Sequence, residues 1–518
     1  MKKLLSILSV TAILCSTGCK KSFDSLQNDP NRATSVPANL ILNGILSDIY
    51  QAPFSPTQRW NQFYACNYAY YGDQQYTWTG VSYNTYNTLK NVVKMEEEAA
   101  KSAAAPNAYS ALAKFIKAYM FYNLTMQTGD IPVSEALKSL ANIAPKYDSQ
   151  KDVFKQILVW LEEANNDMGN VVTKGGYLLS SDFYYNNDLA RWRKAVNAFK
   201  LRVLVQLSKQ EADADLNIKQ KFAETIANPS KYPVFTNMED NMQYVYNAQY
   251  NKYPTNPESF GFDAARYNMT STFLNTLVTL NDPRTFYVAE PAAALVAGGA
   301  ASNSFAAFTA PGSGEDLATM SANAGLGKYS FINRKRYYSS FTAQNTIQIG
   351  YAEMCFNIAE AINRGWLNGN AEDWYTKGIQ AGIGFYGIVN GANNVSFQKP
   401  GGTLSDYNTY TINYDWATYY AQVAVKYAGN NATGLNQIIT QKYLSFYQNS
   451  GWEAYYNWRR TGAPAFHTGA GTGNSNRIAL RFQYPTAEKS INGTNVNSAI
   501  QTQFAGQDDI NAKMWIIK

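Results

Sequence analysis

Apolar side chains recur every three to four positions along several long segments of the chain, which is the period of an amphipathic helix. These segments are 107–128, 149–168, 188–208, 350–367, 371–388 and 435–458. Strand-like alternation of apolar and polar residues is rare and short. The pattern therefore predicts a mostly α fold with minor β-structure.

The segments 350–367 and 371–388 predict an antiparallel helix pair of about the size of a tetratricopeptide repeat. The first segment carries a continuous apolar stripe and a second, polar stripe. Glu360 and Arg364 lie on the polar stripe and are spaced to pair at i,i+4, which is ordinary support for a helix.

Local signals mark where helices begin and where regular structure is expected to stop. Ser149 followed by Asp152 predicts a capping box at the start of one helix, and Asp188 is the expected N-cap of the next. The stretches 291–328 and 390–436 are rich in Gly, Ala, Ser, Asn and Thr. We expect both to be long loops, which in compact domains are often functional.

The N-terminus has the layout of a secretory signal. Lys2 and Lys3 precede a mostly apolar stretch, Leu4–Cys15, and small residues then lead into Cys19. A cysteine in that place indicates bacterial lipoprotein processing, in which cleavage leaves Cys19 at the N-terminus to carry acyl chains. The alternative is an ordinary signal peptide that happens to end near a cysteine, because Ser16 stands where a typical lipobox has Leu.

The predicted organisation is a signal peptide at 1–18 and a single domain over 19–518. After the signal, no apolar run approaches the 18 residues that a membrane-spanning helix needs. Loss of Lys2 and Lys3 lowers the formal net charge of +6 by two. No long basic run is present that could follow a phosphate backbone, so we do not expect nucleic acid as a partner.

Histidine and cysteine are too sparse for most metal or redox sites. His467 is the only histidine, which excludes any site that needs two histidine ligands. Cys66 and Cys355 are the only cysteines beyond Cys19. They could pair in an oxidising compartment, but two buried thiols are the favoured interpretation. We predict no metal site and no cofactor.

Catalytic motifs are missing from the sequence. Gly325–Lys328 is followed by Tyr329 rather than by the Ser or Thr of a P-loop. No Gly-x-Ser-x-Gly nucleophile elbow occurs, and no motif singles out a pair of carboxylates for glycoside hydrolysis. The protein is therefore not expected to be an enzyme.

Short motifs in a fixed order resemble the SusD/RagB family of outer-membrane nutrient-binding lipoproteins, and more narrowly its second SusD-like subfamily. In the N-terminal half they are Asn28–Asn31, Ala118-Tyr119, Gly129–Pro132, Tyr147–Gln150, and Trp192 with Phe199–Arg202. Further on they are Asn281–Arg284, Ala359–Ala361 with Gly365-Trp366, Gln441-Lys442, Trp452-Glu453, Trp458–Gly462 with Pro464, and Arg481–Pro485 with Glu488 and Asn492. Ala198 departs from the serine usual there.

The resemblance implies a SusD-like fold, in which tetratricopeptide-like helix pairs form a scaffold and a less regular half with long loops holds the ligand. It also implies a lipid anchor in the outer membrane, exposure at the cell surface, and a SusC-like TonB-dependent transporter as the partner. Arg459, Arg460, Arg481 and Glu488 are expected to lock the fold through charge-assisted hydrogen bonds rather than to touch ligand.

Aromatic residues are unusually frequent, with 39 tyrosines in the chain. Two clusters lie outside clear helices, at 60–86 and 329–338, interleaved with amide side chains. Flat rings stack on sugar C–H groups and amides bind hydroxyls, so these clusters are the candidate ligand sites. The chosen ligand-binding residues are Tyr71, Gln74, Tyr76, Trp78, Asn84, Arg336 and Tyr338. Packing in the core is the competing interpretation for each of them.

Three functions remain open at this point. The first is binding of nutrient oligosaccharides for delivery to the transporter, which the aromatic and amide content favours. The second is binding of peptides or another non-sugar nutrient, and the third is a structural lid with little affinity of its own.

Overall fold

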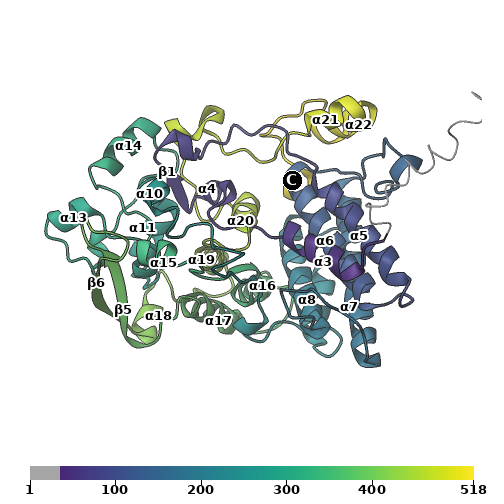
Figure 1. Ribbon diagram of the computed structural model, residues 1–518, viewed down its shortest axis with the longest axis horizontal. Coiled ribbons are helices and arrows are strands. Elements are labelled where there is room, and N and C mark those ends of the chain that lie inside the picture. Colours follow the sequence, from purple (N-terminus) through teal and green to yellow (C-terminus); the bar gives the residue numbers. More distant parts are fainter. Residues whose placement is uncertain (1–34) are drawn as a thin grey trace, which may run out of the picture.

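The structure is a computed structural model, and it describes residues 35–518. Cys19 and the predicted signal peptide lie outside the described residues. Figure 1 shows a bundle of long helices at one end of the molecule and a less regular half at the other. Within residues 35–518, no helix is both long and apolar enough to cross a membrane.

The bundle consists of five helices. They are α3 (Ala38–Asp48), α5 (Thr85–Ala100), α6 (Ala108–Thr128), α7 (Gln150–Lys174) and α8 (Leu189–Gln206). α6 packs against α5 and α7, α7 against α8, and α3 against α5. The three helices expected here are confirmed, as are their starts: the Ser149 hydroxyl accepts from the Asp152 amide, and the Asp188 carboxylate accepts from the Ala190 amide.

The predicted helix pair is also confirmed. It consists of α16 (Tyr351–Asn363) and α17 (Ala371–Gly384), and α19 (Ala432–Ser445) packs against both. α16 also contacts α8, so this second group of helices continues the scaffold of the bundle into the other half. α9 (Ile218–Ala227) also packs against α8.

The single helix expected over 435–458 is wrong, because the chain breaks between α19 and α20 (Glu453–Thr461). Gln448, Ser450 and Gly451 all have positive φ, which no right-handed helix accommodates. At the break, the side-chain carbonyl of Gln448 accepts a hydrogen bond of 2.5 Å from the Phe54 backbone amide. A long-range contact therefore ends a segment whose apolar period is helical.

Three antiparallel two-stranded sheets make up the named strands of the described chain. β1 (Tyr64–Cys66) pairs with β3 (Tyr267–Met269), β2 (Met242–Tyr244) with β4 (Thr346–Ile349), and β5 (Gly391–Gln398) with β6 (Tyr407–Tyr414). In the first sheet Tyr64 lies opposite Met269. In the third, a hairpin, Gly391 lies opposite Tyr414.

The two stretches expected to be loops hold more regular structure than their composition indicates. The first contains α13 (Ala293–Ala297), a 3₁₀ turn η5 (Phe305–Ala307) and α14 (Leu317–Gly325). The second contains the β5–β6 hairpin and α18 (Trp416–Ala421). In β5 only Val395 and Phe397 supply a buried apolar alternation, which is too short to stand out among Gly, Asn and Ser.

Short elements connect these parts. They are α4 (Pro56–Trp60), η1 (Ala69–Tyr71), η2 (Ser139–Ala141), η3 (Leu207–Gln210), η4 (Met238–Asp240), α10 (Phe260–Asp263), α11 (Ser271–Thr279), α12 (Thr285–Val288), α15 (Arg334–Tyr338), η6 (Ala470–Thr472), η7 (Asn474–Asn476), α21 (Thr486–Ile491), α22 (Gly493–Phe504) and η8 (Trp515–Ile517). Together with the elements above they confirm a mostly helical architecture.

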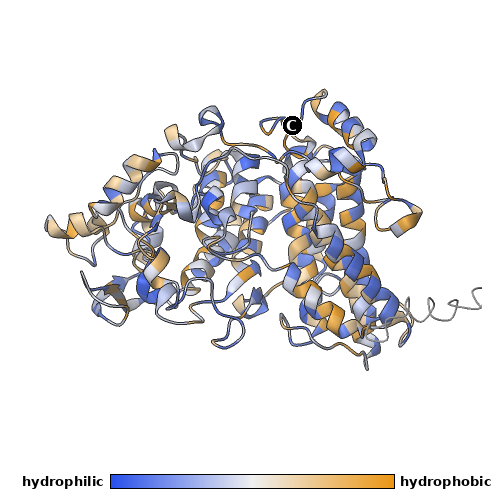
Figure 2. Cartoon of the chain, turned by 45° about the horizontal axis from the view of Figure 1, so that its top comes forward, coloured by the Kyte–Doolittle hydropathy of each residue, from blue (hydrophilic) through white to orange (hydrophobic). Residues whose placement is uncertain are grey.

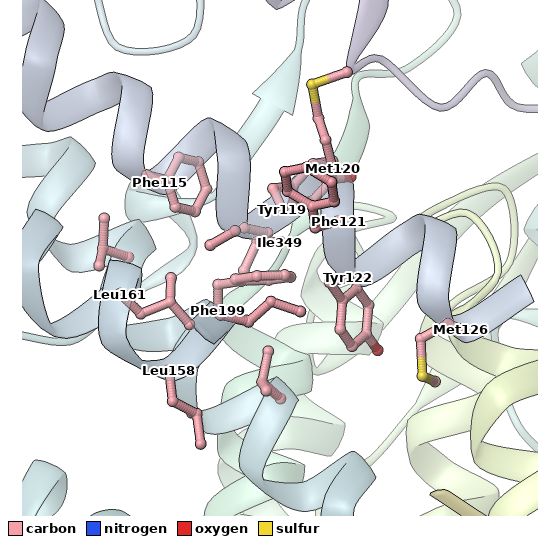
Figure 3. Close-up of a cluster of buried hydrophobic side chains, with 14 of the residues drawn as sticks. Phe115, Tyr119, Met120, Phe121, Tyr122, Met126, Leu158, Leu161, Phe199 and Ile349 are labelled. Carbon is pink, nitrogen blue, oxygen red and sulfur yellow. The ribbon is translucent and has the colours of Figure 1, made fainter. Parts of the chain in front are cut away.

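Each half has its own apolar core. In the bundle, Phe115, Tyr119 and Tyr122 of α6 converge with Phe199 of α8 and with Ile349 (Figure 3). The bundle helices alternate apolar and polar positions along their length, as Figure 2 shows. The second core lies in the less regular half and is dominated by aromatic rings from segments far apart in the sequence.

Buried ion pairs join the helices at the junction of the two halves. Arg202 of α8 binds Glu353 of α16 through two hydrogen bonds of 2.6 Å. Arg460 of α20 binds Glu360 of α16 in the same bidentate way. Burial raises the pKa of Glu360, but the neighbouring guanidinium groups outweigh it and bring that pKa to about 2.

The other charged residues expected to lock the fold also have structural partners. Arg459 donates to the Met126 and Leu480 carbonyls, and Arg481 pairs with Asp508. Glu488 accepts from the Tyr147 hydroxyl. These contacts bear out the prediction that the C-terminal motif holds the fold together.

Candidate ligand-binding site

The predicted aromatic pair of the 60–86 cluster lies in the core. Tyr76 is 1% exposed and Trp78 is 6% exposed. The Trp78 indole stacks on Phe482, with ring centroids 4.2 Å apart and an interplanar angle of 4°. The Tyr76 hydroxyl donates to the Trp60 carbonyl. Neither ring presents a face to solvent in this structure.

Three other predicted residues also have internal partners. Gln74 is buried, and its side-chain carbonyl accepts from the Cys66 amide. Tyr338 is fully buried. Arg336 is half-buried, with its guanidinium 4.5 Å from the centre of the Tyr386 ring and hydrogen-bonded to a glutamine. Their contacts are those of residues that support a surface rather than form it.

Asn84 is exposed and comes directly before α5. Nothing in the described contacts joins its side chain to the other predicted residues. Tyr71 is half-buried and lies at the end of the η1 turn.

The structure does bring the two predicted clusters together, through β3. β1 pairs with one side of this strand, and Phe331 forms a bridge to Asn268 on it. The Met269 amide donates to the Ser330 carbonyl. Segments some 260 positions apart, as expected for two walls of one site, therefore meet here, although four of the chosen side chains, Gln74, Tyr76, Trp78 and Tyr338, are buried.

The aromatic surface beside this sheet is formed by four tyrosines, which we call the tyrosine platform: Tyr68, Tyr70, Tyr71 and Tyr267. Tyr70 is 83% exposed and Tyr68 is 48% exposed. Their rings both lie against Tyr71, at centroid distances of 5.3 and 6.2 Å, and Tyr71 in turn contacts Tyr267 at 6.2 Å. The platform thus extends from the largely exposed ring of Tyr70 to the half-buried ring of Tyr267.

Two arginine side chains contact the platform. Arg59 lies beneath it and donates to the Tyr71 carbonyl at 2.8 Å and to the Cys66 sulfur at 3.1 Å. Gly72 has a φ of +109°, and a Cβ there would come within 2.6 Å of the Arg59 guanidinium. Arg266 lies over the Tyr68 ring at 4.7 Å. The turn is therefore closed tightly onto a buried cation, which fixes the backbone that carries Tyr70 and Tyr71 before any ligand arrives.

The cysteines are both buried and free, in line with the favoured interpretation. Burial raises the pKa of the Cys66 thiol to about 11 in spite of the neighbouring Arg59, so it packs beneath the platform as a neutral thiol. Among residues 35–518 there is no group of three His, Cys, Asp or Glu side chains placed to hold a metal ion.

Tyr68 and Tyr70 lie within the predicted aromatic cluster at 60–86, but they are not among the predicted ligand-binding residues. Nothing in the sequence pointed to Tyr267 or Arg266. The available signal was the sequence Tyr70-Tyr71-Gly72-Asp73, because a glycine–aspartate pair predicts a surface turn beside the two tyrosines.

A helical scaffold that carries an exposed aromatic surface is typical of a binding protein. The comparisons define the class of this protein as outer-membrane nutrient binding. The model of the second SusD-like family, described as starch-binding and associating with the outer membrane, matches residues 30–485. The chain belongs to this family. The family consists of non-catalytic binding proteins, which confirms that the protein is not an enzyme.

Solved structures of relatives agree. A SusD homologue from Bacteroides fragilis is 29% identical with a TM-score of 0.81, over 93% of this chain and 100% of its own. An outer-membrane protein of Bacteroides vulgatus, whose suggested role is nutrient binding, is 30% identical with a TM-score of 0.78, over 93% and 100%. A chitin-binding SusD homologue from Flavobacterium johnsoniae is 18% identical with a TM-score of 0.68, over 93% and 98%, and shares the fold. No curated protein matches the chain.

Proposed function

We propose that the protein binds a nutrient oligosaccharide at the cell surface and delivers it to a SusC-like TonB-dependent transporter. The observation that carries the proposal is the tyrosine platform. Tyr68 and Tyr70 offer exposed faces to a ligand, and Tyr71, the one predicted site residue within the platform, links them to the fold.

The platform suits sugars for a physical reason. A pyranose ring has apolar C–H faces and a rim of hydroxyls, so it stacks on a tyrosine face while its hydroxyls bind nearby polar groups. Because Arg59 and Gly72 already fix the loop, little conformational entropy is lost when a ligand settles on it. Chitin is bound by the F. johnsoniae relative, and the family description names starch, so oligosaccharides of both polysaccharides are the first ligands to test.

In this proposal the residues beneath the surface act as support. Tyr76, Trp78, Gln74 and Tyr338 support the surface from the core, and Arg336 does so through Gln344 and Tyr386. Asn84 stays a predicted contact. The helical scaffold forms the surface toward the transporter, and an acylated Cys19 tethers the protein to the outer membrane.

The test is calorimetric titration of Tyr70→Ala with chitooligosaccharides, maltooligosaccharides and a peptide library. By analogy with other aromatic stacking platforms, loss of one ring costs about 1–3 kcal/mol, which is roughly tenfold or more in affinity. The matched control is Tyr250→Ala, since Tyr250 is 90% exposed and lies outside the platform. Equal affinity of both variants, or binding of peptides and of no glycan, would sink the proposal.

A further inference from the structure

A cavity lies at the far end of the molecule from the bundle, beside the β5–β6 hairpin. Its volume is about 510 Å³, within the range of roughly 300–1,000 Å³ usual for small-molecule sites. Its walls are β6, α18, η5 and the turn that follows α11. We call it the hairpin cavity. It shares no residue with the tyrosine platform, and Figure 1 shows β1 and α10 in the upper part of this half and the hairpin in the lower part.

The rim of the hairpin cavity is polar and carries a single charged side chain, Asp415. Its polar side chains are Asn281, Asn303, Thr411, Asn413, Thr418 and Gln422. No Lys, Arg or His lines this part of the described chain, and Asp415 is the single carboxylate. Asp415 is already used, because it accepts from the Thr418 amide at 2.8 Å and from the Thr418 hydroxyl at 2.6 Å and so caps α18. The rim therefore favours a neutral ligand over an ionic one.

Several rim groups keep hydrogen-bonding capacity for a ligand. Asn303 donates its amide to the Thr411 carbonyl, and Asn281 donates to the Gln422 side chain, which leaves both asparagine carbonyl oxygens as acceptors. The Asn413 side chain is exposed and makes no hydrogen bond to the rest of residues 35–518. The hydroxyl groups of a ligand can therefore donate to the Asn281 and Asn303 carbonyl oxygens, and they can donate to or accept from the Asn413 amide.

The floor of the hairpin cavity is apolar, aromatic and rigid. Phe305 is half-buried and lies 4.7 Å from the buried Phe286 ring. Tyr419 is held by its hydroxyl, which donates to Asp282 at 2.6 Å, and Asp282 in turn binds Arg284 through two hydrogen bonds. An aromatic floor under a rim made mostly of amides and hydroxyls suits a sugar ring, with its C–H groups below and its hydroxyls at the edge.

A peptide is the competing occupant, since β6 is the outer strand of a two-stranded sheet and could pair with an added strand. The Asn303 side chain already occupies the Thr411 carbonyl on that edge. Strand addition would have to break this contact, whereas a sugar would not.

We propose that the hairpin cavity is a second binding site for a neutral saccharide, separate from the tyrosine platform. The inference rests on the proposed function only for the nature of the ligand, a glycan. Two separate sites on one chain would let a long glycan, or a branched one, engage both and gain avidity without any new contact.

Hydrogen exchange measured by mass spectrometry, with saturating chitotetraose or maltotetraose, tests the two sites separately. We expect protection at 303–307 and 411–418 as well as at 66–72. Asn413→Phe places a bulky ring at the cavity rim and removes an amide from it, which should abolish protection at 303–307 and 411–418 while leaving 66–72 protected. Asn408→Phe is the matched control, because Asn408 is another exposed asparagine of β6 that does not line the cavity.

The outcomes separate this inference from the proposed function. Protection at 66–72 alone overturns the second site and leaves the proposed function standing. Protection at 411–418 alone supports the second site and counts against the platform. Loss of protection in both asparagine variants overturns the assignment to the cavity, and no protection with either sugar overturns both proposals.

Discussion

Replacement of Trp78 by alanine should destabilise the protein without touching the ligand surface. The indole is 6% exposed and lies in a box of four rings, stacked on Phe482 and edge-on to Trp60, Trp452 and Tyr455. Its Nε1 makes no hydrogen bond within the described chain, so the variant loses packing alone. Truncating a buried Trp or Phe to Ala costs about 3–5 kcal/mol.

This cost can be converted into a melting temperature. Unfolding entropy is about 2.1 cal/mol/K per residue, which gives about 1 kcal/mol/K for roughly 480 residues that unfold in one transition. Trp78→Ala should therefore lower Tm by about 3–5 °C. The box joins segments around 60, 78, 452 and 482, so the loss falls on long-range packing rather than on any one helix.

Differential scanning calorimetry, with glycan titration well below the transition, checks the expectation. Tyr70→Ala is the comparison variant: its ring is 83% exposed, and surface substitutions usually change stability by less than about 0.5 kcal/mol. Its Tm should stay within about 1 °C of the parent. A Trp78→Ala protein that keeps its Tm and loses glycan affinity would refute the reasoning, because Trp78 would then be a ligand contact.

Four further outcomes are expected. Glu360→Gln leaves Arg460 buried and unpaired, which should lower the free energy of unfolding by about 3–5 kcal/mol in denaturant titrations; an unchanged midpoint would contradict the buried pair. The depressed pKa of Glu360, about 2 against an ordinary 4.5, gives the folded protein a stability that is present above about pH 4.5 and is lost as pH falls toward 2, and Glu360→Gln should flatten this acid limb. Mass spectrometry should find Cys19 as an acylated N-terminus, since two or more acyl chains give stable anchoring, and an unmodified Cys19 would remove the tether. Gentle purification from native membranes should bring down a β-barrel transporter through a large interface, and its absence would contradict the delivery role.

The sequence by itself determined the helical scaffold and the family. Helices at 107–128, 149–168 and 188–208 follow from a 3.6-residue apolar period, and two of them begin at Ser149 and Asp188 because those side chains accept from the first backbone amides. These are local interactions, complete within one or two turns, so they can be read from neighbouring residues. The ordered motifs fixed the family in the same way, since each is a short run of residues.

Tertiary structure decided which aromatic residues form a surface. Trp78 and Tyr70 belong to the same short cluster and have similar local surroundings in sequence, yet one is core and the other is 83% exposed. The difference comes from Trp452 and Phe482, which lie almost 400 positions further along the chain and close over Trp78. The break before α20 has the same origin, because Gln448 is drawn out of helical geometry by its contact with Phe54. Burial is a property of the folded chain, so it cannot be predicted from the residues next to a side chain in sequence.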